Sequence, residues 1–339
     1  MARFSQRTPY WNLRREMVTK PSLSASLGAR LAVPAMSVAL VAGLAASWLL
    51  AGHLVAGAPP MVVAAGRTVA SFVVLTAIAL LYPRPRSEIM VAARRGGSVA
   101  LLGFLSFFAY IGGTMVGTLL IGASRVGLIT SLLPSLTFVV GAIVFREPAT
   151  RRKVLGTALG LLGACGYAVL DTHANELPGM GPTVGALLGG VLLAFGGTLA
   201  YAVYGYVYPR RMTGLSSLGA LPAISGAGAV MLGLVVIAFV PFAGLSWDKW
   251  AGILALGAGL TAPIFLLFHE LVLRKGPLFT TALTLAVPFL IRIGEWALGW
   301  EDAPKPVVIL LLLACVFGVW LTMSGGRPVA GPLVKLRVE

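Results

Sequence analysis

The amino-acid sequence predicts an all-α polytopic membrane protein, with about ten transmembrane helices arranged as two inverted-topology five-helix repeats. Three observations predict this fold: the composition, the spacing of the apolar runs and the distribution of charge. Of the 339 residues, 58% are hydrophobic and only 11% are charged, and the mean hydropathy is +0.92. This composition excludes an ordinary soluble domain.

Apolar runs of roughly 18–25 residues recur along the chain, and this length spans a bilayer core of about 30 Å. They lie at residues 32–56, 61–82, 98–118, 124–145, 153–171, 183–208, 217–243, 250–273, 277–299 and 305–324. Alternation with period two is absent from these runs, which argues against a transmembrane β-barrel.

The net charge of +15 is concentrated in the two tails and in alternate loops. The basic residues of these loops are Arg84, Arg86, Arg94, Arg95, Arg146, Arg151, Arg152, Lys153, Arg210, Arg211, Arg274 and Lys275. The opposite loops carry acids, such as Asp171, Glu176, Asp248 and Asp302. This positive-inside pattern predicts a multi-pass protein of the cell (inner or plasma) membrane with both termini in the cytoplasm. It explains the basic excess without nucleic acid as a partner.

The two ends of the chain are polar. We interpret residues 1–31 as a basic cytoplasmic tail and residues 325–339 as a second cytoplasmic tail. The Arg14-Arg15 pair also fits a twin-arginine signal, but no cleavable apolar region with a small-residue site follows it at the right distance. Cys165 and Cys315 fall inside predicted spans, which indicates small buried apolar residues and neither a disulfide nor a metal site.

An internal repeat relates the two halves of the chain. Residues 130–149, TSLLPSLTFVVGAIVFREPA, align with residues 284–303, TLAVPFLIRIGEWALGWEDA. The alignment superposes Thr130 on Thr284, Pro134 on Pro288 and Glu147 on Glu301. The shared pattern is a threonine, a mid-span proline four residues later and an acid that closes the helix. A general likeness in composition between membrane helices is the alternative explanation.

Each half holds five predicted spans, so the second half enters the membrane from the opposite side. We expect the first repeat at residues 32–172 and the second at residues 183–324. Inverted repeats of this kind are typical of secondary transporters, whose substrate site lies near the midplane between the halves.

The block LLGFLSFFAYIGGTMVGTLLIGASRVGLITSLLPSLTFVVGAIVFREPATRRKVLGTALGLLGACGYAVL, residues 101–170, resembles the drug/metabolite transporter (DMT) superfamily, EamA-like branch. The stretch AGRTVASFVVL resembles the second span of that family, which often carries an arginine where Arg67 stands. The resemblance implies ten helices in two inverted repeats, around a central cavity lined mainly by helices 1, 3, 4, 6, 8 and 9. It also implies export or exchange of amino acids, other metabolites, nucleotide sugars or sugar phosphates.

The ninth span carries a polar stripe. Its members are Thr281, Thr284, Pro288, Arg292 and Glu295, which are spaced by three or four residues and so share one face of a helix. Charged groups inside a membrane face the bundle interior or a water-filled cavity. We therefore assign Arg292 and Glu295 to substrate binding, with Glu295 also a candidate for proton coupling. An intrahelical ion pair that only makes both residues tolerable is the alternative.

The same span predicts a kink. Pro288 removes the backbone hydrogen bond to the Thr284 carbonyl, and the fourth span repeats the arrangement with Thr130 and Pro134. We assign the two prolines to helix kinks and the two threonines to the substrate site. Kinked helices between the repeats suit a site that opens on alternate sides.

Further charged candidates lie in other spans. His269 and Glu270, about one turn from the end of the eighth span, are candidates for proton coupling, with a polar helix end near the headgroups as the alternative. Arg67 and Arg125 lie roughly 6–10 Å below the external surface, a depth from which arginine can snorkel. Arg67 is the substrate-binding candidate of the two, on the basis of the resemblance.

Aromatic residues predict part of a pocket. Tyr201, Tyr204 and Tyr208 share one face of the sixth span, and Trp48 lies in the first. Tyr201, Tyr204 and Trp48 are candidates for the wall of a cavity that favours an aromatic or cationic substrate. Tyr208, next to Pro209, fits an interfacial aromatic belt.

These features predict a secondary active transporter, not an enzyme, that exports or exchanges a small polar metabolite such as an amino acid by alternating access, with proton coupling as an option. The alternatives are an exchanger of organic anions such as sugar phosphates or nucleotide sugars, a transporter of aromatic or quaternary ammonium compounds, a channel, and an integral membrane enzyme. Phosphate loops, ATPase motifs, metal-ligand clusters and nucleophile arrangements are absent from the sequence. The expected partners are the substrate and the bilayer, with no cofactor and no metal; the sequence does not determine the oligomeric state.

Overall fold

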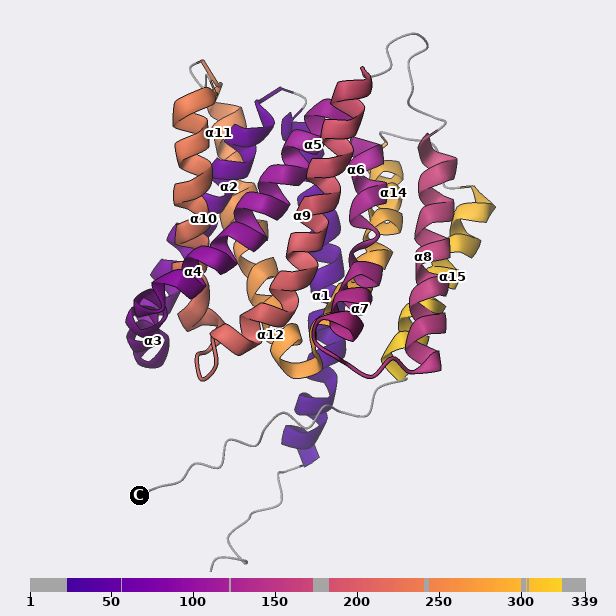
Figure 1. The fold of residues 1–339 in the computed structure, drawn as a ribbon, viewed down its shortest axis with the longest axis horizontal. Coiled ribbons are helices and arrows are strands. Elements are labelled where there is room, and N and C mark those ends of the chain that lie inside the picture. The colour runs from indigo at the N-terminus through magenta and orange to yellow at the C-terminus, as the bar shows by residue number, and fades with distance from the viewer. Residues whose placement is uncertain are drawn as a thin grey trace, which may run out of the picture.

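The computed structural model describes residues 23–55, 57–121, 123–172, 183–240, 244–299, 303 and 305–324. Within these ranges all regular structure is helical (Figure 1). The elements are α1 (Leu23–Val55), α2 (Pro60–Leu81), α3 (Pro83–Arg94), α4 (Gly96–Gly103), η1 (Phe104–Gly112), α5 (Gly113–Ile121), α6 (Ala123–Thr130), α7 (Leu133–Ile143), α8 (Arg151–Thr172), α9 (Val184–Arg211), α10 (Ser217–Phe239), α11 (Trp247–Leu254), η2 (Ala255–Thr261), α12 (Ala262–Lys275), α13 (Pro277–Leu283), η3 (Thr284–Ala286), α14 (Val287–Ala297) and α15 (Pro306–Ser324). The predicted all-α polytopic fold is confirmed. Of the two predicted tails, residues 23–31 form the start of α1, and residues 1–22 and 325–339 lie outside the described residues.

Seven helical segments in the described part of the chain are long and apolar enough to cross a membrane. They are Ala32–Val55, Pro60–Leu81, Gly96–Ile121, Val184–Arg211, Ser217–Phe239, Trp247–Lys275 and Pro277–Ala297. The predicted fourth, fifth and tenth spans correspond to α6 with α7, to α8 and to α15. Leu133–Ile143 and Pro306–Gly318 are apolar but shorter than the seven.

Large apolar side chains on the outside of the bundle agree with a lipid environment. Leu81, Ile237 and Phe239 are 78%, 76% and 81% exposed. A soluble monomer rarely leaves a large contiguous apolar surface in water, whereas hydrocarbon is the natural surroundings of such side chains.

The fourth and ninth spans are interrupted at aligned positions. α6 ends at Thr130 and α7 begins at Leu133, one residue before Pro134. α13 ends at Leu283, three residues of 3₁₀-helix follow, and α14 begins at Val287, one residue before Pro288. Proline has no N–H for the bond to the carbonyl four residues back, so the ladder is open there in both spans.

The threonine before each break makes the same kind of hydrogen bond. The Thr130 hydroxyl donates to the Gly127 carbonyl at 2.9 Å, and the Thr284 hydroxyl donates to the Thr281 carbonyl at 2.7 Å. Both side chains therefore bond three residues back within their own helix, and both remain half-buried.

The third and eighth spans each contain a π-helical segment, which the sequence did not predict. η1 continues α4 into α5, and η2 continues α11 into α12. π-helical turns inside longer helices are frequent at functional sites, because the wider turn re-aims side chains.

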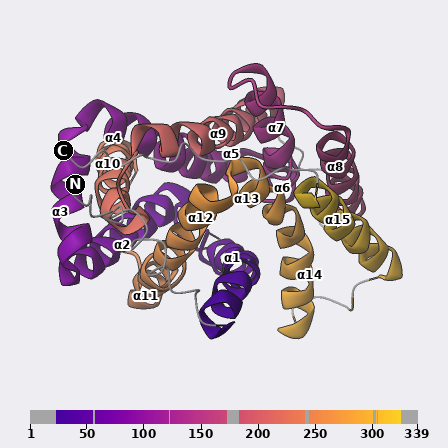
Figure 2. The same ribbon diagram turned by 90° about the horizontal axis from the view of Figure 1, so that it is seen from below.

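The contacts between helices are similar when each helix of one half is replaced by its equivalent in the other half. α2 packs on α10, the second span on the seventh, and α8 packs on α15, the fifth on the tenth. The third span, η1 with α5, packs on α9, and its equivalent, η2 with α12, packs on α1. Likewise α7 packs on α9, and its equivalent α14 packs on α1. Figures 1 and 2 show α8 beside α15 at one edge of the bundle and α10 with α3 near the other.

Three of the basic connections meet at one end of the bundle. The Arg95 guanidinium donates to the Arg211 carbonyl at 2.8 Å, and Ser216 binds Glu88 of α3. Ser217, at the start of α10, donates to Glu270 of α12 at 3.4 Å. The loops after α2, α9 and α12, which carry positive charge, therefore lie together, as the positive-inside pattern requires.

Candidate functional site

Arg67 is held inside the bundle, beside two tyrosines from other helices. α2 begins at Pro60, so Arg67 lies about 10 Å along the helix at 1.5 Å per residue. Its electrostatic neighbours are the phenol groups of Tyr110, from η1, and Tyr201, from α9. The rings of Tyr110 and Tyr201 stack with centroids 4.3 Å apart and planes 16° apart. Two segments of the first half and one of the second half therefore meet at this cation.

The guanidinium of Arg67 is not fully satisfied by the protein. Its Nε atom is buried and has no hydrogen-bond partner among the described residues. No ion pair joins Arg67 to an acid in the described part of the chain. Burying a cation without an anion costs several kcal/mol, so such a group marks a place where a ligand supplies the missing charge.

Arg67 and Tyr110 keep part of their surface open. Both lie deep in the bundle, yet both are half-buried and not fully buried. Tyr201, by contrast, is only 6% exposed and backs Tyr110. A cation and an aromatic face that remain accessible inside an apolar bundle are the elements of a small-molecule site.

The two π-helical segments both touch this site. η1 supplies Tyr110, and η2 packs against the main chain of α2 at Arg67 itself. A Cβ atom at Gly257 in η2 would lie 2.5 Å from the Arg67 carbonyl oxygen. Glycine at this position allows η2 to approach the α2 backbone and to hold Arg67 between the two segments.

An aromatic ladder runs along α9 away from this site. Tyr201 and Tyr204 stack with centroids 5.5 Å apart, and Tyr204 and Tyr208 follow at 5.9 Å. Tyr204 is fully buried, so it packs in the core and does not line an open space. Tyr208 is 1% exposed, and its ring centroid lies 4.5 Å from that of His269. Tyr208 is therefore not part of the expected interfacial belt, because α12 covers it.

His269 is fully buried within the ladder. Its Nδ1 atom lies 2.5 Å from the Phe265 carbonyl oxygen, and its Nε2 atom contacts the Tyr204 hydroxyl. A carbonyl only accepts, so Nδ1 carries the proton and Nε2 accepts from Tyr204. Both nitrogens are therefore used by the neutral ring.

Glu270, the neighbour of His269, faces the end of the bundle. It pairs with Arg274 at 2.7 Å and accepts a hydrogen bond from Ser217. The carboxylate side chain is 36% exposed, so this is a partly solvated helix-end pair. The buried Tyr208 hydroxyl has no hydrogen-bond partner among the described residues, although Ser217 and Glu270 both lie close to it.

Arg292 and Glu295 lie on a different helix and have different neighbours. Both are half-buried on α14, and each interacts with at least one other group. α14 packs on α1: a Cβ atom at Gly294 would lie 2.7 Å from the Cδ1 atom of Leu49. Trp48, beside Leu49, is half-buried at this contact. The main neighbours of α2 are instead α10 and η2, so the structure does not pair Arg292 with Arg67 through packed helices.

The end of the fourth span forms a second polar cluster, on α9. The Tyr206 hydroxyl donates to the Glu147 carboxylate at 3.1 Å, and its ring stacks on Phe145 at 4.7 Å. The Arg210 guanidinium lies over the Phe145 ring, 4.3 Å from its centroid. The acid that closes the fourth span therefore fastens it to the sixth. Its counterpart Glu301 lies outside the described residues, as do the side chains of Arg125 and Cys165.

Sequence reasoning missed Tyr110 as the partner of Arg67. The two residues come from different spans, and a contact between spans leaves no signal in local spacing. The family resemblance pointed to Arg67 alone. In the described part of the chain, no three His, Cys, Asp or Glu side chains gather in a way that would hold a metal ion.

Comparison with known proteins agrees with this architecture. Residues 33–169 match the model of the EamA-like transporter family. The first half of the chain is EamA-like. This part of the chain is therefore similar to a family of membrane transporters.

A solved crystal structure of another protein has the same fold. It matches with a TM-score of 0.71 over 88% of this chain and 99% of that chain, at 19% sequence identity. The shared fold thus extends beyond the residues that the family model matches. No curated protein matches the sequence.

Proposed function

We propose that this transporter moves a small polar metabolite, an amino acid or a related compound, by alternating access at a site built around Arg67, Tyr110 and Tyr201. The observation that carries the proposal is the half-buried Arg67, whose buried Nε atom has no hydrogen-bond partner among the described residues, beside a tyrosine stack that joins the two halves. The proposed route is export or exchange across the cell membrane, with both termini in the cytoplasm.

The exchange of helix pairs between the halves supports inverted repeats at residues 32–172 and 183–324. The aligned breaks before Pro134 and Pro288 support the same division. In such transporters the substrate lies between the repeats, and rocking of one against the other opens it to alternate sides. Thr130 and Thr284, at the breaks, are proposed contacts on the moving helices.

The chemistry of the site favours a carboxylate joined to an apolar or aromatic group. The Arg67 guanidinium offers the paired donors that a carboxylate accepts. Tyr110 offers an open ring face to the rest of the substrate. Trp48, Arg292 and Glu295 remain proposed members of the wider cavity, through α1 and α14, whereas Tyr204 packs in the core.

An organic anion such as a sugar phosphate is the second candidate substrate. The observation that favours it is that Arg67 has no acidic partner among the described residues. A phosphate would supply that charge as well as a carboxylate does.

For proton coupling, we favour Glu295 for its place within a span over the other two candidates. His269 uses both ring nitrogens in its neutral form, and Glu270 is paired with Arg274 at a solvated helix end. Glu295 is half-buried inside a span, where an acidic residue is a candidate for a functional site.

The experiment is an uptake screen in proteoliposomes, with amino acids and sugar phosphates as labelled substrates and with a pH gradient present or absent. We expect uptake of at least one amino acid, and loss of that uptake in Arg67→Ala by at least tenfold, because a charge-assisted bond to a buried group is removed. Tyr201→Phe and Tyr208→Phe form a matched pair on one helix, and only the first should impair uptake. Transport of sugar phosphates alone would establish the second candidate, and full activity of Arg67→Ala would refute the site.

A further inference from the structure

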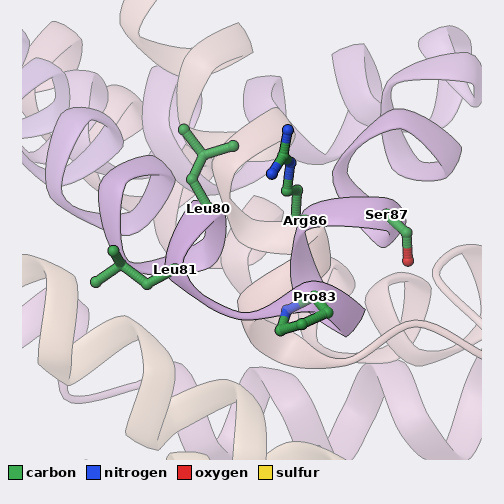
Figure 3. A pocket seen from close by; sticks show the side chains of 5 residues that line it. All are labelled: Leu80, Leu81, Pro83, Arg86 and Ser87. Atoms are coloured by element: carbon green, nitrogen blue, oxygen red, sulfur yellow. The ribbon is translucent and has the colours of Figure 1, made fainter.

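A groove lies where α2 leaves the bundle and α3 begins. Its volume is about 430 Å³, and it is lined by Leu80, Leu81, Pro83, Arg86 and Ser87. Figure 3 shows the Leu80 and Arg86 side chains extending in the same direction, one from the last turn of α2 and one from α3. An apolar wall at the end of a membrane span thus meets a cation on a surface helix.

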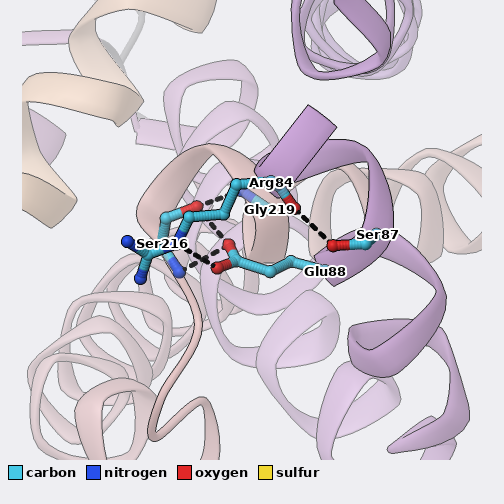
Figure 4. A network of polar contacts seen from close by, with 5 residues as sticks. All are labelled: Arg84, Ser87, Glu88, Ser216 and Gly219. Atoms are coloured by element: carbon cyan, nitrogen blue, oxygen red, sulfur yellow. Dashed lines mark hydrogen bonds and ion pairs between the residues drawn. The ribbon is translucent and has the colours of Figure 1, made fainter. Parts of the chain in front are cut away.

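The helix that carries Arg86 is fixed in place. Glu88 of α3 accepts hydrogen bonds from the Ser216 backbone N–H at 2.8 Å, from the Ser216 hydroxyl, and from the Arg84 Nε at 2.9 Å (Figure 4). Ser216 is itself the N-cap of α10, where its hydroxyl accepts from the Gly219 N–H. A carboxylate at the start of α10 also suits the positive end of the helix dipole. The groove is therefore preformed on a rigid support.

The face of α3 that points away from the protein mixes cations with apolar side chains. Glu88 and Ala92 are buried against the bundle. On the opposite side Arg86 and Arg94 are exposed, and Met90, between them, is 61% exposed. A short helix of this kind lies in the plane of a membrane interface, with its apolar residues in the acyl region and its cations at the phosphates.

Arg86 is the group in the groove that is available to an anion. Its guanidinium makes no hydrogen bond or ion pair with another residue in the described part of the chain, whereas Arg84 pairs with Glu88 and Arg95 binds Arg211. The Ser87 hydroxyl donates to the Arg84 carbonyl at 2.8 Å, which leaves Arg86 as the donor for a ligand.

We propose that this groove binds an anionic phospholipid of the surrounding leaflet, with the headgroup phosphate on Arg86 and an acyl chain along Leu80 and Leu81. The charge of the headgroup complements Arg86, and the chain covers side chains that are 52% and 78% exposed. The site is separate from the substrate cavity and does not depend on which compound is transported.

The experiment titrates the purified full-length protein in neutral detergent with phosphatidylglycerol and counts bound lipid by native mass spectrometry. Phosphatidylcholine is the parallel titration, and inorganic phosphate at equal concentration is the competitor. We expect preferential retention of phosphatidylglycerol and little competition by phosphate. Arg86→Ala should lower the affinity for the first bound lipid roughly tenfold, because a charge-assisted hydrogen bond is lost.

Arg94→Ala is the matched control: it removes an exposed arginine from the same helix outside the groove. The proposal requires at most a twofold change in this variant. Equal losses in Arg86→Ala and Arg94→Ala would show attraction to general positive charge and overturn the site. Equal retention of the two lipids, or displacement of phosphatidylglycerol by inorganic phosphate, would overturn the lipid as the ligand. Arg86→Lys, which keeps the charge and the fold, should fall between the wild type and Arg86→Ala.

Discussion

The two intramembrane arginines, Arg67 and Arg292, are placed in opposite ways. Arg67 lies between helices of both halves, beside two phenols, and has no acidic partner in the described part of the chain. Arg292 lies on α14, and Glu295 follows it by one turn on the same stripe. The comparison teaches that Arg292 has an acid one turn away on its own helix, whereas α2 carries no acid that could balance Arg67.

The largest expected effect separates the two arginines. Arg67→Ala should reduce uptake by at least tenfold, because the substrate loses its charge-assisted contact. Arg292→Ala should reduce it several-fold, because Glu295 remains in a span without its neighbour. The measurement is initial uptake in proteoliposomes at equal amounts of inserted protein. A larger loss in Arg292→Ala would reverse the comparison and move the main contact to α14.

The next effect tests whether the tyrosine stack depends on close helix packing. A Cβ atom at Gly197 of α9 would lie 2.5 Å from the Ala109 carbonyl oxygen, one turn from the contact of Tyr201 with Tyr110. Gly197→Ala should cost roughly 1–3 kcal/mol of stability by overpacking and should weaken transport. Gly196→Ala is the control, since nothing lies within 4 Å of a Cβ there. Thermal unfolding in detergent measures both, and equal melting temperatures for the two variants would contradict this account of the contact.

A third effect concerns proton coupling. Glu295→Gln should abolish the dependence of uptake on a pH gradient while leaving exchange at equal pH, because the amide keeps the shape and cannot release a proton. Glu270→Gln should retain the dependence, since that carboxylate sits in a solvated pair with Arg274. The two variants are compared with and without an imposed gradient. A pH response that survives Glu295→Gln removes this role from α14.

The smallest effect concerns Glu88, far from both arginines. Burial alone would raise its pKa, but the hydrogen bonds from Ser216 and Arg84 and the charge of Arg84 hold the pKa below the ordinary value of 4.5. A depressed folded-state pKa stabilises the protein above the unfolded-state pKa, and this stabilisation is lost as the pH falls through the folded-state value. Glu88→Gln should therefore cost about 1 kcal/mol at neutral pH and less near pH 4. Melting temperatures across this range test it, and a constant difference would contradict the assignment.

Much of the fold could be predicted from the sequence, because the length of an apolar run and the charge of a loop are both read from consecutive residues. The breaks before Pro134 and Pro288 follow from the missing N–H of proline. Helix α3 was not predicted: Pro83 and the arginines suggested a loop, and only contact with α10 shows which side is buried. The π-helical segments were not predictable either, since a wider turn depends on what packs against it.

The candidate site was predicted only in part. Arg67 came from the family resemblance, and the stripe of Arg292 and Glu295 came from helical spacing. The stack of Tyr110 on Tyr201 joins residues of different halves, and neither composition nor periodicity reports such a contact. The hydrogen bond between His269 and Tyr204 likewise depends on packing between α9 and α12, and Phe265 binds the other ring nitrogen.

The most direct test of the central claim is a double-mutant-type cycle, in which the Arg67 side chain and the substrate carboxylate are removed singly and together. Uptake of the identified amino acid and of its analogue without the carboxylate is measured for the wild type and for Arg67→Ala. If Arg67 binds the carboxylate, the wild type should prefer the amino acid at least tenfold and the variant should transport both at similar low rates. An undiminished preference in Arg67→Ala would contradict the account.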